Sequence, residues 1–364
     1  MKPDPGHGST SLSGHPLMIQ RETIEHYVLT AFPDARLLEF RALGSGAHGT
    51  GYCLKLDTPE GTHDYVIKIL APRGLGHDYP SDRAAVFLLA HAEYGNLPNH
   101  VRAIDVISQM PDGSWKSVGG GKEYYLIMER AVGTTYFADL ALFRNKQSLE
   151  QEDIRKIMSM TEYLARIHAV KKQRKALYWR KLRDIIGHGE CLMGVFDTYP
   201  EGVLDYREMA AIEKKCVDWR ARLKPFHHRL SQIHGDFHPG NIWFHDSTFT
   251  LLDRSRGPFG EPADDVTALT INYIFFSIQY FNDIRSPFID AFRLFFTDYL
   301  RRTGDREILE VCGLFYAFRG AVIANPVFYP EVTGEQRKLI FSFVRNVLED
   351  TLFDFEGVNR YLEG

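Results

Sequence analysis

The chain has 364 residues, 44% of them hydrophobic, which is enough for more than one domain with a substantial core. Its net charge of −4 provides no global basic field, so we expect no nucleic-acid partner. The four cysteines lack CxxC spacing and a paired histidine, which argues against a zinc site or a disulfide framework. The N-terminus has no signal-peptide pattern, and the longest apolar stretch, 271–281, is too short to span a bilayer. We therefore expect a cytoplasmic protein without a membrane partner.

The first third of the chain has the pattern of a small, β-rich lobe, which we place at 19–130 after a disordered tail at 1–18. The tail is rich in Gly, Ser, Pro and His. Apolar residues that alternate on both sides of a turn predict a β-hairpin over 43–70. The other predicted elements are a helix from Arg21 that stops at Pro33, a helix from Ser81 to Gly95, and strands at 101–108 and 123–129.

From residue 131 to residue 364 the apolar residues recur mainly at helical spacing, which predicts a larger helical lobe. The predicted helices span 151–170, 205–224, 264–281, 287–303, 306–325 and 334–353. A short connector near 129–133 joins the two lobes. The expected fold class is therefore α+β, with a small antiparallel-sheet N-lobe and a helical C-lobe that holds the catalytic loop and the acceptor site.

Three glycines in G-x-G-x-x-G spacing open the predicted hairpin. The same spacing opens a dinucleotide-binding unit, but there a helix follows the glycines, whereas here two strands follow. Glycines between two strands allow backbone amides to close over nucleotide phosphates, with a flexible hairpin loop as the alternative. The loop predicted to bind nucleotide consists of Gly44, Ser45, Gly46, Ala47, His48 and Gly49.

Lys68 lies one strand after the glycines, and its side chain points away from the face of its apolar neighbours Ile67 and Ile69. A lysine at this place can contact the α- and β-phosphates of a nucleotide, although a solvated strand lysine is the alternative. In kinases a helix carboxylate holds this lysine. Asp82 and Glu93 are both candidates on nearly the same helix face, and the sequence does not choose between them.

The strongest signal is the run HGDFHPGN at 234–241, with Asp253 following twelve residues after Asn241. Asp236 can accept a hydroxyl proton, while the Asn241 amide oxygen and the Asp253 carboxylate can hold Mg²⁺. The two histidines of the run are expected to be structural. Together with the upstream glycines and Lys68, these residues predict phosphoryl transfer from ATP, with GTP as an alternative donor.

These motifs resemble the aminoglycoside phosphotransferase family, the small-molecule branch of the protein-kinase-like fold. IHGDFHPGNIWF is similar to the catalytic-loop pattern of the family, and LLDRSRGPFGEPADDV looks like its metal aspartate with the segment that follows. YYLIMERAVG resembles its hinge, which implies that the backbones of Glu129 and Ala131 contact the adenine. The resemblance covers roughly residues 38 to 270 and implies a two-lobed kinase with a small-molecule hydroxyl as acceptor.

The identity of the acceptor is open, and an aminoglycoside-like antibiotic, an amino alcohol and a sugar are candidates. Carboxylates at 201–208 and 349–356 could line a cleft for a polycation, but solvated helix faces are the usual role of such runs. Aromatic residues at 273–281 could hold a quaternary amine, although core packing is the preferred interpretation. Two alternatives to a small-molecule kinase remain, namely a nucleotide-binding pseudokinase that serves as an interaction module and a kinase with a macromolecular acceptor.

Two arginines depart from the resemblance. Arg254 follows the metal aspartate, where family members commonly carry an aromatic residue, and Arg256 adds a second cation. They indicate either an anionic acceptor or an internal ion pair to Glu261 or Asp264.

Overall fold

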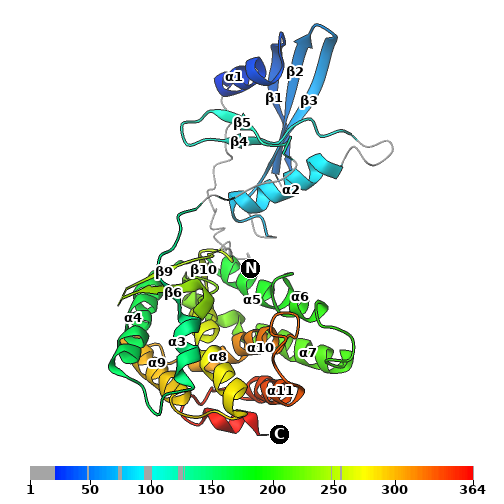
Figure 1. The fold of residues 1–364 in the computed structure, drawn as a ribbon. Coiled ribbons are helices and arrows are strands. Elements are labelled where there is room, and N and C mark those ends of the chain that lie inside the picture. The colour runs from blue at the N-terminus through cyan, green and yellow to red at the C-terminus, as the bar shows by residue number, and fades with distance from the viewer. Residues whose placement is uncertain are drawn as a thin grey trace, which may run out of the picture. The chain divides into compact units, whose positions relative to one another are not determined.

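The chain divides into two compact units, Met1–Ile127 and Met128–Gly364 (Figure 1). Each unit is described by itself below. The expected tail at 1–18 lies outside the described residues. The computed structural model describes residues 21–46, 49–72, 76–93, 101–121, 126, 128–246, 248–254 and 256–363.

The first unit is built on a three-stranded antiparallel sheet. Strands β2 (Gly49–Thr58) and β3 (Gly61–Leu70) are the predicted hairpin, and Thr58 pairs with Gly61 at its turn. Strand β1 (Arg36–Gly46) was missed by the sequence prediction and pairs with β2 along its length. The glycine-rich segment therefore connects β1 to β2.

Helix α1 (Arg21–Ala31) packs on this sheet and forms the core of the first unit. The helix ends two residues before Pro33, as predicted, because the residue before a proline disfavours helical backbone. Ile24 and Val28 lie one turn apart and are fully buried. The buried residues of the cluster are Ile24, Val28, Ala35, Leu54 and Leu56.

The remaining elements of the first unit are helix α2 (Pro80–Glu93) and a small hairpin of β4 (Ile107–Gln109) and β5 (Trp115–Ser117). Helix α2 confirms the helix predicted after Ser81. The strand predicted over 101–108 is wrong in extent, because only its last two residues belong to β4, and β5 was not predicted. The Asp112-Gly113 turn between them, with φ +87° at the glycine, is a hairpin signal that was overlooked.

The strand predicted over 123–129 has no counterpart in its described part. Residues 126, 128 and 129 are described and lie in no strand, while 123–125 and 127 lie outside the described residues.

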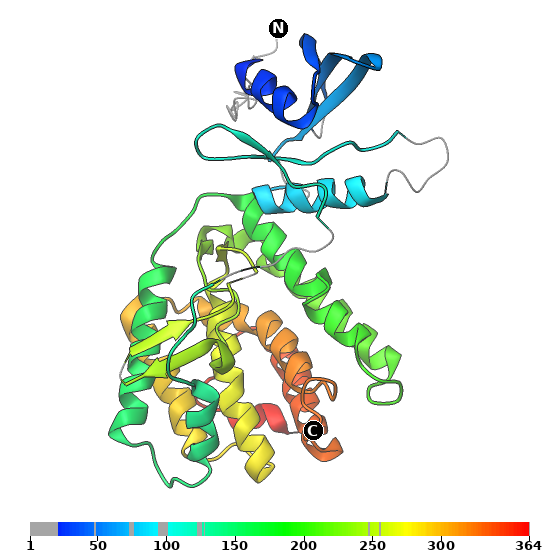
Figure 2. The ribbon, with the colours of Figure 1, turned by 45° about the horizontal axis from the view of Figure 1, so that its top comes forward.

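The second unit is mostly helical, with a few short strands (Figures 1 and 2). Its elements in chain order are β6 (Thr134–Thr135), α3 (Tyr136–Phe143), α4 (Gln151–His168), α5 (Lys175–Gly187), α6 (Leu192–Asp197), α7 (Tyr206–Leu223), η2 (Lys224–Arg229), β7 (Ser231–Gln232), η3 (Pro239–Asn241), β8 (Ile242–His245), β9 (Thr248–Leu251), β10 (Phe259–Gly260), α8 (Pro262–Phe281), α9 (Phe288–Thr303), α10 (Ile308–Ile323), α11 (Gly334–Glu349) and η4 (Val358–Leu362).

The six helices predicted for this part correspond to α4, α7, α8, α9, α10 and α11. Helices α3, α5 and α6 were not predicted. In α5 the charged residues interrupt the apolar pattern, and one of them, Lys181, is itself buried. The predicted α+β class, with a small antiparallel-sheet unit followed by a larger helical unit, is confirmed.

Helix α8 is the central helix of the second unit, and every residue from Pro262 to Ile278 is buried. Helices α3, α9, α10 and α11 pack against it, as expected for a helix that is apolar on all sides (Figure 2). Tyr273 stacks edge-on against Tyr136, and Phe276 stacks on Phe137, so these rings belong to the core. Among the helices of the described residues, none has the length and apolar character needed to cross a membrane.

Candidate active site

The predicted catalytic loop connects β7 to β8 in the second unit. β7 pairs with β10, with Gln232 opposite Phe259, and β10 is followed directly by α8. The beginning of the loop therefore lies beside the N-terminal turn of α8. That turn carries the two adjacent aspartates Asp264 and Asp265, both fully buried.

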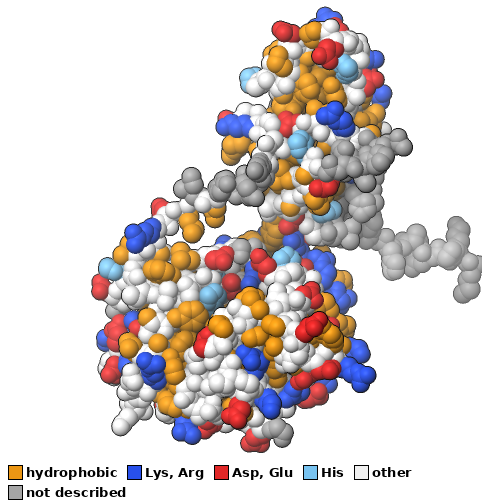
Figure 3. Space-filling model, turned by 45° about the vertical axis from the view of Figure 1, so that its right-hand side comes forward, with side chains coloured by type: hydrophobic (Ala, Val, Ile, Leu, Met, Phe, Trp, Pro, Cys, Tyr) orange, Lys and Arg blue, Asp and Glu red, His pale blue; other side chains and the backbone are white. Residues whose placement is uncertain are grey.

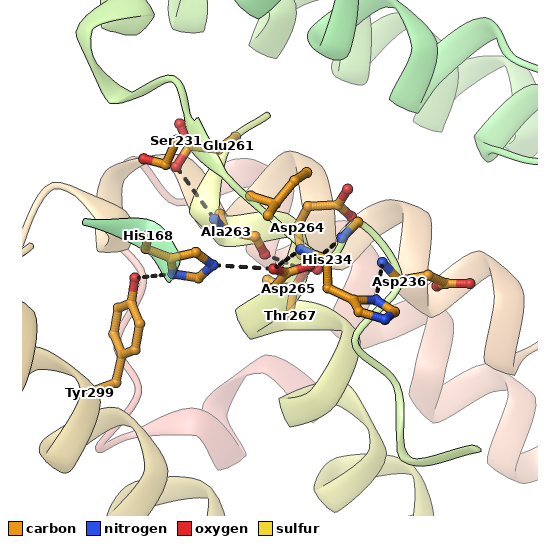
Figure 4. A network of polar contacts seen from close by, with 12 residues as sticks. His168, Ser231, His234, Asp236, Glu261, Ala263, Asp264, Asp265, Thr267 and Tyr299 are labelled. Atoms are coloured by element: carbon orange, nitrogen blue, oxygen red, sulfur yellow. Dashed lines mark hydrogen bonds and ion pairs between the residues drawn. The ribbon is translucent and has the colours of Figure 1, made fainter. Parts of the chain in front are cut away.

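Asp265 anchors the loop by its backbone (Figure 4). Its Oδ2 accepts from the backbone N–H of His234 and its Oδ1 from that of Gly235, each at 2.7 Å. Nε2 of His168 lies 3.2 Å from the same carboxylate, and the Tyr299 hydroxyl lies 2.9 Å from Nδ1 of that histidine. Burial raises the pKa of Asp265, but the hydrogen bond and charge of His168 outweigh it, so the pKa is lowered. The carboxylate therefore stays charged and holds both amides.

Gly235 has the one backbone conformation in the loop that requires glycine. Its φ is +90°, and a Cβ there would lie 3.4 Å from the Cβ of Arg256. Arg254 braces the start of the loop, because its Nε and Nη2 donate to the carbonyl of Ile233, two residues before Gly235, at 3.0 and 2.9 Å. The backbone just before Asp236 is thus fixed on both sides.

Asp236, the predicted base, is 7% exposed and carries two arginine contacts on one oxygen. Nη1 of Arg319 donates to Oδ1 at 2.5 Å, and Nη1 of Arg256 lies 3.4 Å from the same atom. Burial by itself raises the pKa of Asp236, but the charges of Arg319 and Arg256 lower it to about 2. Oδ2 has no hydrogen bond from any described residue, so it is the oxygen that can receive a substrate hydroxyl.

Arg319 on α10 belongs to a buried chain of alternating charges that sequence analysis missed. Its Nη2 donates to Oδ1 of Asp264 at 2.8 Å, and Nζ of Lys181 lies 2.7 Å from Oδ2 of that aspartate. α5, α8 and α10 therefore meet in ion pairs behind the base. The available signal was a lone arginine within the apolar run FYAFRGAVI, since a buried arginine requires a charged partner.

The predicted metal ligands lie at the open end of the β8–β9 hairpin: Asn241 directly precedes β8, and Asp253 follows two residues after β9. Ile242 pairs with Leu251 in the ladder, and the Leu252 amide donates to the Asn241 carbonyl at 3.0 Å. Nδ2 of Asn241 donates to the carbonyl of Asp236 at 3.0 Å, which leaves the amide oxygen available. Asp253 is exposed, and none of the described residues donates a hydrogen bond to its carboxylate.

This donor set fits magnesium. Mg²⁺ binds proteins through one or two carboxylate or amide oxygens and completes its octahedron with water and substrate phosphates. Asp253 has φ +53°, a strained left-handed conformation for an aspartate that is typical of residues held for function. Across the described parts of the chain, no group of three or more His, Cys, Asp or Glu side chains could form a closed metal site.

The two histidines of the loop have structural contacts. Nδ1 of His234 accepts from the Asp236 amide at 3.3 Å, and Nδ1 of His238 accepts from the Gly240 amide at 3.1 Å. Burial lowers the pKa of His238 more than the nearby Asp236 raises it, so this ring is neutral at physiological pH.

In the first unit, the glycines and Lys68 share one row of the sheet. Gly44 on β1 pairs with Gly51 on β2, which pairs with Lys68 on β3. Gly49 must be glycine, since a Cβ there would lie 1.8 Å from the carbonyl oxygen of Ile69. Ala47 and His48 lie outside the described residues, and Ser45 and Gly46 are described by their backbone alone.

The helix carboxylates predicted for Lys68 lie at the two ends of α2. Oδ2 of Asp82 accepts from the backbone N–H of Tyr79 at 2.8 Å, and Glu93 is the last residue of the helix. The choice between them stays a prediction. Glu129 and Ala131, the predicted hinge residues, lie outside helices and strands in the second unit, and Glu129 is exposed.

The two arginines that follow Asp253, the predicted metal ligand, have different contacts in the structure. Arg254 binds backbone carbonyls, as described above. Arg256 pairs with neither Glu261 nor Asp264, because Arg229 and Tyr178 hold Glu261 and Arg319 and Lys181 hold Asp264. The predicted ion pair of Arg254 or Arg256 with Glu261 or Asp264 is therefore wrong, because Arg254 donates to backbone carbonyls and Arg256 lies beside Asp236.

The acidic runs lie elsewhere, in surface contacts of helix ends. Asp205 caps α7 by accepting from the Arg207 amide. Glu208 pairs with Arg345, and Glu349 with Lys215. These carboxylates line no part of the cavity beside the base, which has a volume of about 150 Å³ and lies between α8, α10 and the catalytic loop.

Residues 39–279 match the model of the phosphotransferase enzyme family, APH. The chain belongs to this family. Membership confirms the resemblance drawn from the catalytic-loop motif, the protein-kinase-like fold class, and the class of enzyme. The protein is a small-molecule kinase that transfers phosphoryl groups to an alcohol acceptor.

Direct comparison of this phosphotransferase with curated proteins found no match. Similar solved structures include amicoumacin kinase hAmiN in complex with AMP-PNP, Ca²⁺ and Ami (14% identity, 91% of this chain and 96% of that chain, TM-score 0.38). Others are a glucosamine kinase with glucosamine, ADP and inorganic phosphate (15%, 89% and 98%, 0.38) and a Plasmodium vivax ethanolamine kinase (12%, 90% and 80%, 0.35). Because these TM-scores are low, the assignment rests on the family match and on the chain's own residues.

Proposed function

We propose that this phosphotransferase moves the γ-phosphoryl group of ATP to a hydroxyl of a small molecule, with Asp236 as the base. The observation that carries the proposal is the state of its carboxylate. Arg319 and Arg256 occupy Oδ1, whereas Oδ2 is free of hydrogen bonds from the described residues and belongs to a residue that lines a cavity. A substrate hydroxyl in that cavity can donate to Oδ2.

The reaction forms a bond between the acceptor oxygen and the γ-phosphorus. The bond from that phosphorus to the β–γ bridging oxygen breaks, and ADP leaves with the electron pair. The hydroxyl proton passes to Oδ2 of Asp236 and then to solvent. A carboxylate with a pKa of about 2 is a weak base, which suits a loose transition state in which orienting the hydroxyl matters more than early proton removal.

The remaining predicted residues have assigned roles in this proposal. Asn241 and Asp253 would hold Mg²⁺, which neutralises charge on the phosphates. The loop from Gly44 to Gly49 would cover the phosphates, and Lys68 would contact the α- and β-phosphates. The backbones of Glu129 and Ala131 would contact the adenine.

The test is a phosphorylation screen with radiolabelled ATP, and with GTP in parallel, across aminoglycosides, amino alcohols, sugars and hydroxy acids. We expect label in a small molecule, and Asp236→Asn should lower turnover by about 10²- to 10⁴-fold while nucleotide affinity changes only a few-fold. Asp218→Asn, an exposed aspartate on α7, is the matched control. Substantial activity in Asp236→Asn would refute the assignment of the base, and label in macromolecules alone would refute the acceptor class.

The metal ligands have a separate readout. Asp253→Asn keeps a residue type that tolerates the left-handed backbone but removes the charge. We expect Mn²⁺ binding in the presence of a non-hydrolysable ATP analogue, followed by electron paramagnetic resonance, to weaken by about tenfold or more. Unchanged Mn²⁺ binding would contradict the role of Asp253.

A further inference from the structure

Three residues that line the cavity beside Asp236 carry buried polar atoms without a hydrogen-bond partner among the described residues. Nε and Nη1 of Arg256, Nε of Arg319 and Oδ1 of Asn272 are all buried and have no hydrogen bond among the described residues. Arg319 and Asn272 are 5% and 3% exposed. Buried donors and acceptors are normally satisfied, and a group left unsatisfied costs about 1–3 kcal/mol. These residues therefore have hydrogen-bonding capacity that a molecule bound in the cavity can use.

The charges that line this cavity sum to a positive value. Two guanidinium groups, Arg256 and Arg319, face one carboxylate, Asp236, which leaves a net charge of +1. His238 also lines the cavity and is neutral, as described above. Glu190 lies 3.9 Å from Nε of Arg256, but its side chain is 64% exposed, so it screens this cation only weakly.

Arg319 and Arg256 differ in how closely carboxylates of the protein contact their guanidinium groups. Arg319 forms short ion pairs to both Asp236 and Asp264. Among the described residues, Arg256 has only the 3.4 Å contact to Asp236, the 3.9 Å contact to Glu190 and the face of the Phe318 ring, 5.4 Å from its guanidinium carbon. Arg256 is therefore the cation of this cavity with charge left for a ligand.

The other walls of the cavity are apolar. Ala268 and Ile271 come from α8, Val322 and Ile323 come from α10, and Tyr329 also lines the cavity. Such walls suit the carbon skeleton of an organic molecule and give nothing to a bare inorganic ion. The volume of about 150 Å³ is below the roughly 300–1,000 Å³ of whole-ligand pockets, so the cavity holds a small acceptor or the reacting end of a larger one.

We propose that the acceptor is an organic anion, a hydroxylated carboxylate or phosphate ester, whose anionic group binds Arg256 while Asn272 accepts a hydrogen bond from a second hydroxyl. This inference rests on the proposed function, since the ligand of the cavity is taken to be the acceptor. It disfavours a polycationic acceptor. Asp236 is the only carboxylate among the described residues that line the cavity, and it already carries two arginines.

The face drawn in Figure 3 shows no acidic area for a polycation. On the face of the larger, helical unit drawn in Figure 3, the described acidic and basic side chains are interspersed and form no continuous acidic area. The carboxylates predicted as a possible cleft lining are engaged at helix ends, as described above. A guanidinium fork, in contrast, matches the geometry of a carboxylate or phosphate group.

The first experiment measures binding without catalysis. Isothermal titration of the nucleotide-free protein compares glycerate with glycerol, and gluconate and glucose 6-phosphate with glucose and glucosamine. In each set that shows binding, we expect the anion to bind about tenfold or more tightly than its neutral or cationic counterpart, because it forms a charged hydrogen-bond pair. Equal or weaker binding of all three anions, or no binding of any anion at millimolar concentration, overturns the inference.

Variants of Arg256 assign the preference to this residue. Arg256→Gln should reduce the preference for anions by about tenfold or more, and Arg256→Lys should retain part of it. Arg285→Gln, which changes an exposed arginine between α8 and α9, is the matched control. Thermal unfolding of each variant establishes that it is folded. If Arg256→Gln is folded and retains the full preference for anions, the assignment is wrong. This holds whether or not Arg256→Lys folds.

The kinetics separate this inference from the proposed function. With an anionic acceptor, Arg256→Gln should raise the KM for the acceptor and leave the KM for ATP unchanged. A rise confined to the KM for ATP would instead place Arg256 on the donor phosphates and overturn the inference. Anion binding through Arg256 without any phosphoryl transfer would refute the proposed function, and with it the identification of the bound anion as the acceptor, while leaving Arg256 as an anion-binding residue. Efficient transfer to amino alcohols that is unchanged in Arg256→Gln would support the proposed function and refute the inference.

Discussion

Arg319 on α10 and Asp236 in the catalytic loop form a buried ion pair of 2.5 Å, although 83 positions separate them in the chain. The same guanidinium bonds Asp264, so one side chain joins the predicted base to the N-terminal turn of α8. The pair fixes the carboxylate and keeps it charged, while its second oxygen accepts no hydrogen bond from the described residues.

Removal of Arg319 should destabilise the protein. In Arg319→Met, the ion pairs that remain among the described residues are the 3.4 Å contact of Asp236 to Arg256 and the pair of Asp264 with Lys181. Breaking a buried ion pair on one side costs about 3–5 kcal/mol of unfolding free energy. Urea denaturation measures the change, and the exposed control Arg285→Met should stay within about 0.5 kcal/mol of wild type. A loss below about 1 kcal/mol would show that the pair contributes no net stability.

The pH dependence of stability should carry the signature of Asp236. Its folded pKa of about 2 lies below the ordinary value of 3.8, so the ionised group stabilises the fold fully above pH 3.8, and this contribution is lost as the pH falls through about 2. The difference in unfolding free energy between wild type and Asp236→Asn should therefore shrink by about 2 kcal/mol over that interval. A difference that is constant from pH 5 to pH 2 would contradict the lowered pKa.

Asp265 should control the order of the catalytic loop. In Asp265→Asn the amide group can accept at one oxygen only, so one of the two loop amides, His234 or Gly235, loses its acceptor inside the protein. We expect a loss of about 1–3 kcal/mol in stability and faster hydrogen exchange at these amides. Asp218→Asn serves as the control. Unchanged protection of both amides would refute the anchoring role.

Gly235 and Gly202 form a matched pair for separating backbone strain from site geometry. Both have positive φ, +90° and +80°, but a Cβ at Gly202 meets nothing within 4 Å, whereas at Gly235 it meets Arg256. Each alanine variant should lose about 1–2 kcal/mol of stability. Gly235→Ala alone should also lower kcat, by about tenfold to a hundredfold, because it shifts the loop that holds Asp236. Equal activity in the two variants would contradict this account.

The local pattern of the sequence predicted most helices of the second unit because their apolar residues recur every three to four positions. It also predicted the β2–β3 hairpin, whose residues alternate on both sides of a turn. It failed where the pattern is short or interrupted. β4 and β5 span three residues each, and the apolar face of α5 includes Lys181, whose burial depends on an ion pair that the sequence does not display.

The candidate active site likewise has a part that the sequence predicted and a part that it did not. The order of Asp236, Asn241 and Asp253 along the chain predicted the family, which the family match confirms, and it predicted the roles that we propose for these residues in phosphoryl transfer. Only the tertiary structure decided what surrounds the base. Arg319, Asn272 and Asp265 come from α10 and α8, and which of their side chains face Asp236 depends on how these helices pack. The positive charge of the cavity, and with it the anionic acceptor that we infer, therefore follows from the packing of α8 and α10 against the loop.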